Sequence, residues 1–120
     1  MQKLKILIVD DEKALRTIFK RVLEKSGHEI LTAGNGLEAI RLLAIHNDIN
    51  LTITDLDMGE MDGLDLLVYM KNTEHNSRRW LASGAMTPEV SNIALNELGA
   101  EVACVKINLL KKFKEKGIIE

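Results

Sequence analysis

Apolar positions along the chain repeat with two different periods. Short apolar runs with the length of β-strands occupy residues 4–9, 29–33, 51–54, 80–83 and 102–105. Segments whose apolar residues recur at the spacing of one helix face follow these runs, at residues 12–25, 36–46, 62–72, 88–98 and 108–116. Because strand and helix patterns alternate with short connections, the sequence predicts an α/β fold with a parallel sheet and right-handed crossovers.

The runs at 4–9, 51–54 and 102–105 contain few polar residues, as expected for strands that helices cover on both faces. We therefore predict a five-stranded parallel sheet with helices on both faces. Of the doubly wound strand orders, we adopt the flavodoxin-like order 2-1-3-4-5. The polar stretch 72–79 is expected to be one surface loop. Since no repeat, low-complexity tract or linker interrupts the pattern, residues 1–120 are expected to form a single domain.

Composition narrows the functional classes. Hydrophobic residues make up 46% of the 120 residues and charged residues 28%, as in globular rather than disordered chains. The formal net charge of −2 gives no reason to expect nucleic-acid binding. The single cysteine, Cys104, lies in an apolar run, so we expect a buried thiol, and no Cys/His spacing suggests zinc. Neither a signal peptide nor a membrane span is predicted, which leaves a cytoplasmic location as the default.

Charged residues follow three of the apolar runs. Asp10 and Asp11 come directly after the first run, Asp55 after the third and Lys106 after the fifth, while Ser83 ends the fourth. Unpaired charges are costly to bury, so they belong where a sheet opens to solvent. In the predicted strand order, ligands bind outside the carboxyl ends of strands one and three. We therefore expect the three carboxylates to surround one pocket, with the amine and the hydroxyl at the same edge.

This combination of groups suggests a particular chemistry. Three neighbouring carboxylates repel one another unless a cation neutralises them, and ligation by oxygen alone suits Mg²⁺. With the metal bound, the pocket would offer a carboxylate nucleophile, a Lewis acid, a hydroxyl and an amine. Those are the groups needed to receive a phosphoryl group on a carboxylate.

The segments ILIVDDE, LTITDLDMGEMDGLDLL and LASGA, together with Lys106, resemble the receiver domain of two-component response regulators. The resemblance extends over the whole chain, in order and with the family's spacing. It implies that Asp55 is the phosphoacceptor and that Asp10 and Asp11 are the acid pair that holds Mg²⁺. The backbone carbonyl of Asp57 would complete the protein ligands of the metal.

The same resemblance assigns the remaining groups and the partners. Ser83 is similar to the family's hydroxyl residue, and Lys106 to the lysine that pairs with the phosphoryl group. A histidine kinase or phosphotransfer protein would be the donor, and a downstream effector protein or domain would receive the signal. The chain would promote its own phosphorylation and dephosphorylation without being an enzyme for a diffusible substrate. No direct nucleic-acid or membrane binding is expected.

Three positions depart from the family's pattern. Gly59 stands where a proline usually follows the phosphoacceptor, Ala103 replaces an aromatic residue, and Ile107 replaces the proline after the lysine. A cis bond before Ile107 would cost roughly 2.5–4 kcal/mol rather than about 0.5–1. We therefore expect a trans bond, an outward displacement of residues 106–109 and a less firmly held lysine.

These departures favour an alternative function, a pseudo-receiver that acts as a protein-interaction module without phosphorylation. A flavin-binding domain of the same fold is a more distant alternative. It would need a hydroxyl-rich phosphate loop after the first strand, where the sequence DDE would instead repel phosphate.

Several residues also have a purely structural interpretation. Asp11 could cap the first helix by accepting backbone N–H bonds, and Asp62 is expected to cap the third. Trp80 is expected to lie in the core. The three histidines follow no ligand spacing and are interpreted as ordinary surface residues: His28, His46 and His75.

Overall fold

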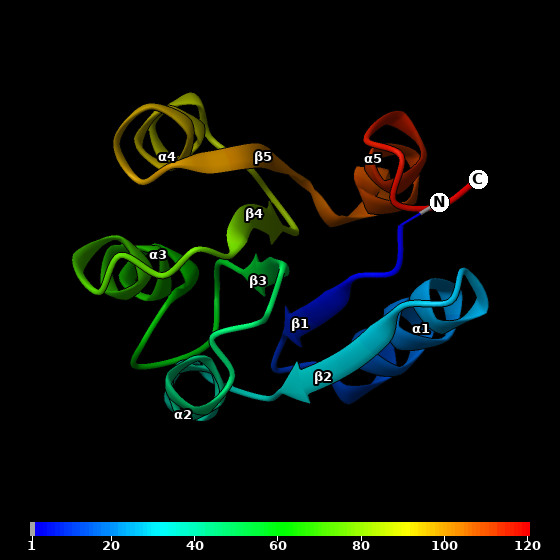
Figure 1. Ribbon diagram of the computed structural model, residues 1–120. Helices are drawn as coiled ribbons and strands as arrows, with labels where there is room; N and C mark the ends of the chain where they lie inside the picture. Colours follow the sequence, from blue (N-terminus) through cyan, green and yellow to red (C-terminus); the bar gives the residue numbers. More distant parts are fainter. Residues whose placement is uncertain (1) are drawn as a thin grey trace.

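The computed structural model describes residues 2–120 (Figure 1). Its strands are β1 (Lys5–Val9), β2 (Glu29–Ala33), β3 (Leu51–Asp55), β4 (Arg78–Ser83) and β5 (Ala100–Val105). Its α-helices are α1 (Lys13–Lys25), α2 (Gly36–Ile45), α3 (Gly63–Asn72), α4 (Pro88–Asn92) and α5 (Leu109–Glu115). A π-helical segment, η1 (Ile93–Glu97), continues α4, and a 3₁₀ turn, η2 (Lys106–Asn108), precedes α5.

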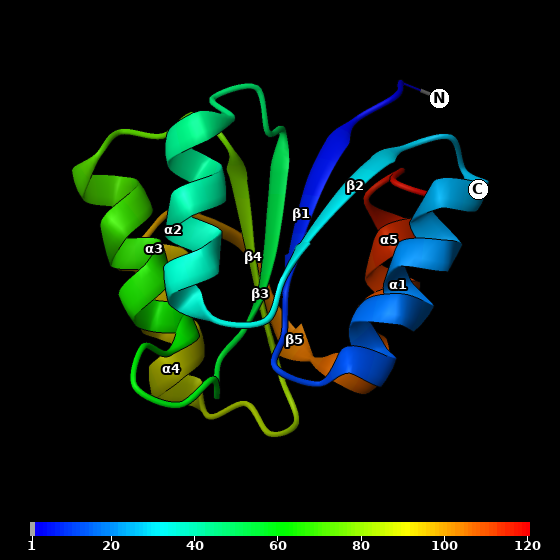
Figure 2. The same cartoon turned by 90° about the horizontal axis from the view of Figure 1, so that it is seen from below.

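Within these residues the strands form one sheet in the order β2-β1-β3-β4-β5, and every neighbouring pair is parallel. Helices α1 and α5 cover one face of the sheet, and α2, α3 and α4 cover the other (Figures 1 and 2). The predicted fold class and strand order are therefore confirmed. The order makes β1 and β3 direct neighbours and pairs Val9 with Thr54, so both strands end at the same edge of the sheet.

The alternation of side chains along each strand divides the core into two layers. In β1, Ile6 and Ile8 join the cluster that includes residues of α1 and α5, whereas Leu7 and Val9 join the cluster beneath α2 and α3. This is the period-two alternation of a strand with both faces covered. It explains why β1 is apolar from Ile6 to Val9.

Three aromatic side chains pack together in the layer between the sheet and helices α1 and α5. Phe113 of α5 stacks on Trp80 of β4 with ring centroids 5.7 Å apart, and meets Phe19 of α1 edge-on at 6.1 Å. Trp80 and Phe113 are fully buried, which confirms the predicted core position of Trp80. Because large aromatic rings bury much apolar area, this cluster attaches both helices to the sheet.

Strand β4 begins earlier than predicted, so the interpretation of residues 72–79 as one loop is wrong at its end. Arg78 already pairs with Leu51 of β3, and its Nε lies 2.8 Å from a carboxylate oxygen of Glu101. The guanidinium of Arg79 donates to the backbone carbonyls of His75 and Leu98, each at 3.0 Å. The long arginine stems lie along the sheet while their charged ends find polar partners, which allows polar residues in a strand.

The predicted helix at 88–98 has two parts. Thr87 caps its start, because its hydroxyl oxygen accepts a hydrogen bond from the Val90 N–H at 3.2 Å. From Ile93 onward the helix widens into a π turn, and the N–H of Leu98 donates to the carbonyl of Ile93 at 3.1 Å. Apolar spacing alone does not distinguish a short π segment from an α-helix. The sequence therefore predicted where this helix begins and ends but not that its second half is π-helical.

The interpretation of His28 as a surface residue is wrong. Its side chain is buried, Nδ1 accepts from the Leu4 N–H at 2.9 Å, and Nε2 lies 2.7 Å from the Ile118 carbonyl. These partners assign a neutral ring with the proton on Nε2. His46 and His75 are half-buried, beside Lys5 and the Leu43 carbonyl respectively.

Two further sequence predictions concern the thiol and the membrane. Cys104 is buried, as predicted, and burial raises the pKa of its thiol, which suits a structural rather than a reactive cysteine.

Among residues 2–120, no helix is both long enough and apolar enough to span a bilayer.

Candidate functional site

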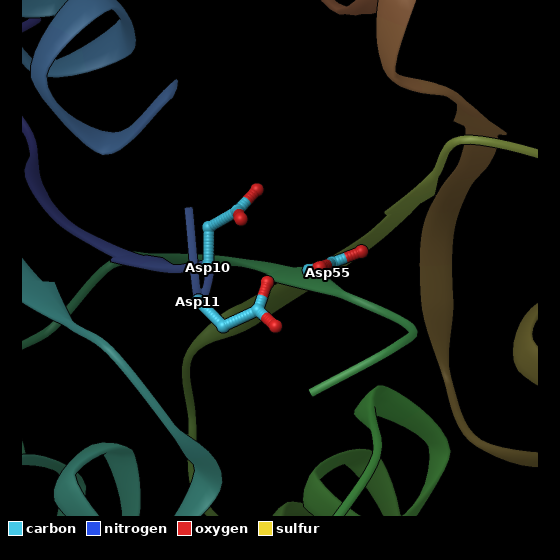
Figure 3. A group of neighbouring side chains, drawn as sticks. All are labelled: Asp10, Asp11 and Asp55. Atoms are coloured by element: carbon cyan, nitrogen blue, oxygen red, sulfur yellow. The ribbon is translucent and has the colours of Figure 1, made fainter. Parts of the chain in front are cut away.

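The ends of β1 and β3 bring three carboxylates together (Figure 3). Asp10 follows β1 directly and Asp55 is the last residue of β3. One carboxylate oxygen from each of Asp10, Asp11 and Asp55 lies within 4.8 Å of the other two. Asp10 and Asp55 are buried, with 4% and 5% exposure, while Asp11 is exposed. The site therefore has two desolvated acids and one acid that faces solvent.

Hydrogen bonds from three directions hold Asp10 in place. Its N–H donates to the Ala33 carbonyl at 3.1 Å, which continues the sheet by one residue beyond β1. One carboxylate oxygen accepts from the Glu12 N–H at 2.9 Å, and the backbone carbonyl accepts from the Arg16 guanidinium at 2.5 Å. The second carboxylate oxygen faces Lys106. The turn between β1 and α1 therefore fixes both the backbone and the side chain of Asp10.

Asp11 does not cap the first helix. Helix α1 begins at Lys13 with Glu12 as its N-cap, and the Glu12 side chain makes no capping hydrogen bond. The alternative interpretation of Asp11 as a helix cap is therefore wrong, and its carboxylate belongs to the acid cluster.

The start of α3 packs directly against the backbone of Asp55. Gly63 donates its N–H to the Leu56 carbonyl at 2.8 Å. A Cβ at position 63 would collide with the Asp55 carbonyl oxygen and would lie 2.7 Å from a methyl of Leu81. Asp62 and Asp65 form a capping box at this helix start, which confirms the predicted cap at Asp62. The glycine of the Met-Asp-Gly segment is thus required because α3 approaches the end of β3 so closely.

Lys106 bridges the two buried acids. Its Nζ lies 2.9 Å from a carboxylate oxygen of Asp10 and 3.2 Å from one of Asp55, and its side chain is 15% exposed. The Lys106–Ile107 bond is trans, as expected. The expected loosening of the lysine is wrong, because the η2 turn directs Ile107 into solvent, 89% exposed, while Lys106 still reaches the acids.

Burial and charge act in opposite directions at this site. Burial raises the pKa of Asp55, the Asp10 charge raises it further, and Lys106 partly opposes both. Burial alone would lower the pKa of Lys106, but the hydrogen bonds and charges of Asp10 and Asp55 outweigh it and raise that pKa. The cluster contains three carboxylates, and the single ammonium of Lys106 contacts two of them, so the cluster retains excess negative charge. A divalent cation bound to oxygen ligands would neutralise that excess.

The remaining predicted residues lie at or near the same edge. Ser83 ends β4 next to β3 and is fully buried, and its hydroxyl oxygen accepts from the Ala85 N–H at 3.3 Å. The N–H of Asp57 donates to a carboxylate oxygen of Asp55 at 3.4 Å. Asp57 as a metal ligand through its carbonyl stays a prediction, as do the chemical roles of Ser83 and Lys106.

Gly59 has φ +83°, a conformation that proline cannot adopt because its ring fixes φ near −65°. The loop after Asp55 therefore follows a different path from one that carries the family's usual proline. Ala103 is half-buried in the cluster beneath the α3–α4 face, where the family commonly has a ring.

Sequence reasoning missed Arg16. Its guanidinium reaches back from α1 to the Asp10 carbonyl, and a Cβ at Gly34 would lie 3.3 Å from the same guanidinium. Arg16 lies one helical turn after Glu12, which places it on the side of α1 that meets the β1 turn. This four-residue spacing was the feature of the sequence that could have indicated a role for Arg16 at the site.

Comparison with known proteins identifies the family of the chain. The family model described as the response regulator receiver domain matches residues 6–118. A chemotaxis protein CheY homolog of Campylobacter jejuni is 43% identical over 65 residues, which covers 53% of this chain and 50% of that protein. The sensory/regulatory protein RpfC of Xanthomonas campestris is 31% identical over 116 residues, 93% of this chain and 16% of that protein.

The chain thus spans only about half the length of the CheY homolog. Among solved structures, a CheY-like response regulator receiver domain protein from Methanospirillum hungatei superposes with a TM-score of 0.81 and 31% identity. That superposition covers 96% of this chain and 94% of that one. Since the family model matches nearly its whole length, the chain belongs to the response regulator receiver domain family of two-component signalling systems.

Proposed function

We propose that this chain accepts a phosphoryl group on Asp55 from a phosphohistidine donor and relays the resulting change to a partner. One observation carries the proposal. The Asp55 carboxylate lies in a cluster with Asp10 and Asp11 and only 3.2 Å from the Lys106 ammonium. A nucleophilic carboxylate, a cation site and a positive charge are therefore available at one place.

In the proposed transfer, a carboxylate oxygen of Asp55 forms a bond to phosphorus. The bond between phosphorus and the donor's imidazole nitrogen breaks, and its electron pair returns to that nitrogen. Lys106 balances the negative charge of the acyl phosphate, and the Ser83 hydroxyl donates a hydrogen bond to a phosphoryl oxygen. Attack of water on phosphorus later breaks its bond to the Asp55 oxygen, which releases inorganic phosphate and regenerates the carboxylate. The chemistry is therefore limited to the chain's own phosphorylation and dephosphorylation.

Mg²⁺ is the cation that suits this donor set, because every protein ligand offered is an oxygen atom. We assign the carboxylates of Asp10, Asp11 and Asp55 and the backbone carbonyl of Asp57 as its protein ligands. When bound, the ion supplies Lewis acidity toward phosphoryl oxygens. The excess negative charge of the cluster supports this assignment.

The partners belong to the same proposal. A histidine kinase or phosphotransfer protein would supply the phosphoryl group, and an effector protein or domain would read the phosphorylated state. Receiver domains are signalling domains rather than classical enzymes. We retain a cytoplasmic location and a single domain over residues 1–120 as parts of the proposal.

The proposal is tested by incubating the protein with acetyl phosphate and Mg²⁺ and measuring its intact mass. We expect a gain of one phosphate in the wild type and in Asp48→Ala, which removes an exposed aspartate at the opposite edge of the sheet. Asp55→Ala should show no gain, and excess chelator should abolish the gain in the wild type.

A gain that persists in Asp55→Ala would show that another residue is the phosphoacceptor. No gain in any variant, with either acetyl phosphate or a phosphorylated histidine donor, would instead support a pseudo-receiver that works through binding alone.

A further inference from the structure

A pocket separate from the acid cluster lies between the start of α2 and the loop that joins β3 to α3. Its volume is about 540 Å³. It is lined by Asn35, Gly36, Leu37, Met58, Glu60 and Met61. Figure 2 shows that the first turn of α2 and this loop lie at the same end of the molecule. Neither Asp10 nor Asp55 lines the pocket, so the proposed phosphorylation does not account for it.

The interior of the pocket is apolar and adaptable. Leu37 is 54% exposed although it lies in the first turn of a helix that packs on the core. Met61 lies directly against the backbone of Gly36, where a Cβ would collide with its thioether. Met58 is buried beneath the loop. Methionine side chains are flexible and polarisable, so they adjust to apolar groups of different shapes.

The side of the pocket formed by the β3–α3 loop is acidic. No lysine or arginine occurs between Arg41 and Lys71. Four acids of this interval lie in the β3–α3 loop or the first turn of α3: Asp57, Glu60, Asp62 and Asp65. Glu60 itself lines the pocket and is exposed. An occupant with an apolar side chain and adjacent positive charges would be complementary to both properties.

We propose that this pocket docks a cationic segment of a partner protein, in which a leucine, methionine or phenylalanine side chain is flanked by lysine or arginine. The apolar side chain enters between Leu37 and Met61 and supplies most of the affinity. The flanking cations lie near Glu60 and the other loop acids and speed association. The proposal does not depend on phosphorylation of Asp55.

The test uses the unphosphorylated protein in the presence of Mg²⁺ and three synthetic peptides, with binding followed by NMR shifts of backbone amides. The probe is N-acetyl-Arg-Arg-Leu-Arg-Arg-amide. One control peptide replaces its leucine with serine, and the other replaces its arginines with glutamates. We expect shifts at residues 35–37 and 58–61 with the probe, and binding at least about fivefold weaker with either control.

Matched variants separate the pocket from general charge effects. Leu37→Ser should weaken probe binding about fivefold, whereas Ile45→Ser, at the other end of α2 and 73% exposed, should not. Glu60→Gln should weaken binding in a salt-dependent manner, whereas Glu24→Gln on α1 should not. All four positions are exposed, so folding is retained.

Three results would overturn the proposal. Equal binding of the serine control peptide would mean that charge alone drives association. Shifts centred on residues 10–11 and 55 would place the cations at the acid cluster. Concentration-dependent self-association of the protein, abolished by Leu37→Ser in sedimentation, would identify a second copy of this chain as the occupant.

Discussion

Asp55 carries its charge in a buried position, and this makes stability depend on pH. Its pKa in the folded state is raised above the ordinary value of 3.8, first by burial and then by Asp10. The folded state therefore holds the proton more tightly than the unfolded state, and Asp55 lowers stability as pH rises from 3.8 through the raised pKa. We predict that Asp55→Asn, in chelator, increases the free energy of unfolding more at pH 7 than at pH 4.

Urea unfolding followed by Trp80 fluorescence measures this difference. An equal increase at both pH values would contradict the assigned cause, because it would reflect packing rather than ionisation.

Asp11 provides a contrasting prediction at the residue scale, because it belongs to the same acid cluster but is exposed. Asp11→Asn should change stability without metal by no more than about 0.5 kcal/mol, as for other surface substitutions. It should nevertheless weaken Mg²⁺ binding in calorimetric titration. A marked loss of stability in chelator would restore a structural role for Asp11.

At the scale of secondary-structure elements, Gly63 sets how closely α3 approaches the end of β3. Gly63→Ala would force the helix away from the Asp55 carbonyl and the Leu81 methyl. We expect a loss of about 1–3 kcal/mol in urea unfolding, typical of overpacking, together with slower phosphorylation from acetyl phosphate. Gly84→Ala is the matched control, because a Cβ there meets nothing within 4 Å. Equal stability of the two variants would mean that α3 moves without cost.

Helices and strands were predictable where an apolar run gives way abruptly to charged residues. Apolar strands that end in Asp10 and Asp55 indicated both the sheet and the edge at which the acids meet, because parallel strands deliver their carboxyl ends to one side. The start of β4 was missed because Arg78 and Arg79 are charged, and charged residues are typical of loops. In the structure their aliphatic stems lie along the sheet and their guanidinium groups find polar partners. The left-handed conformation of Gly59 was invisible as well, since glycine adopts many conformations.

At the scale of the whole molecule, alternating strand and helix patterns predicted a parallel sheet with helices on both faces, because few topologies satisfy right-handed crossovers and short connections. The observed order is one of the two common doubly wound orders, and the pattern alone does not choose between them. The sheet edge at which Lys106 lies was predicted, but its close contacts with Asp10 and Asp55 were not, since they depend on how the η2 turn replaces the family's usual proline. The burial of His28 could not be predicted either. Its two hydrogen-bond partners lie 24 residues before it and 90 residues after it.

His28 joins the two ends of the chain across the fold. Its ring accepts from the Leu4 N–H ahead of β1 and donates to the Ile118 carbonyl after α5. His28→Ala would leave both backbone groups without their partner, so we expect a loss of about 1–3 kcal/mol in urea unfolding. Hydrogen exchange should quicken selectively at Leu4 and near Ile118. His46→Ala, which removes a half-buried ring beside the Lys5 ammonium, should cost less, because Lys5 keeps its ion pair with Asp48. Equal losses for the two variants would show that His28 contributes only ring volume and no specific link between the ends.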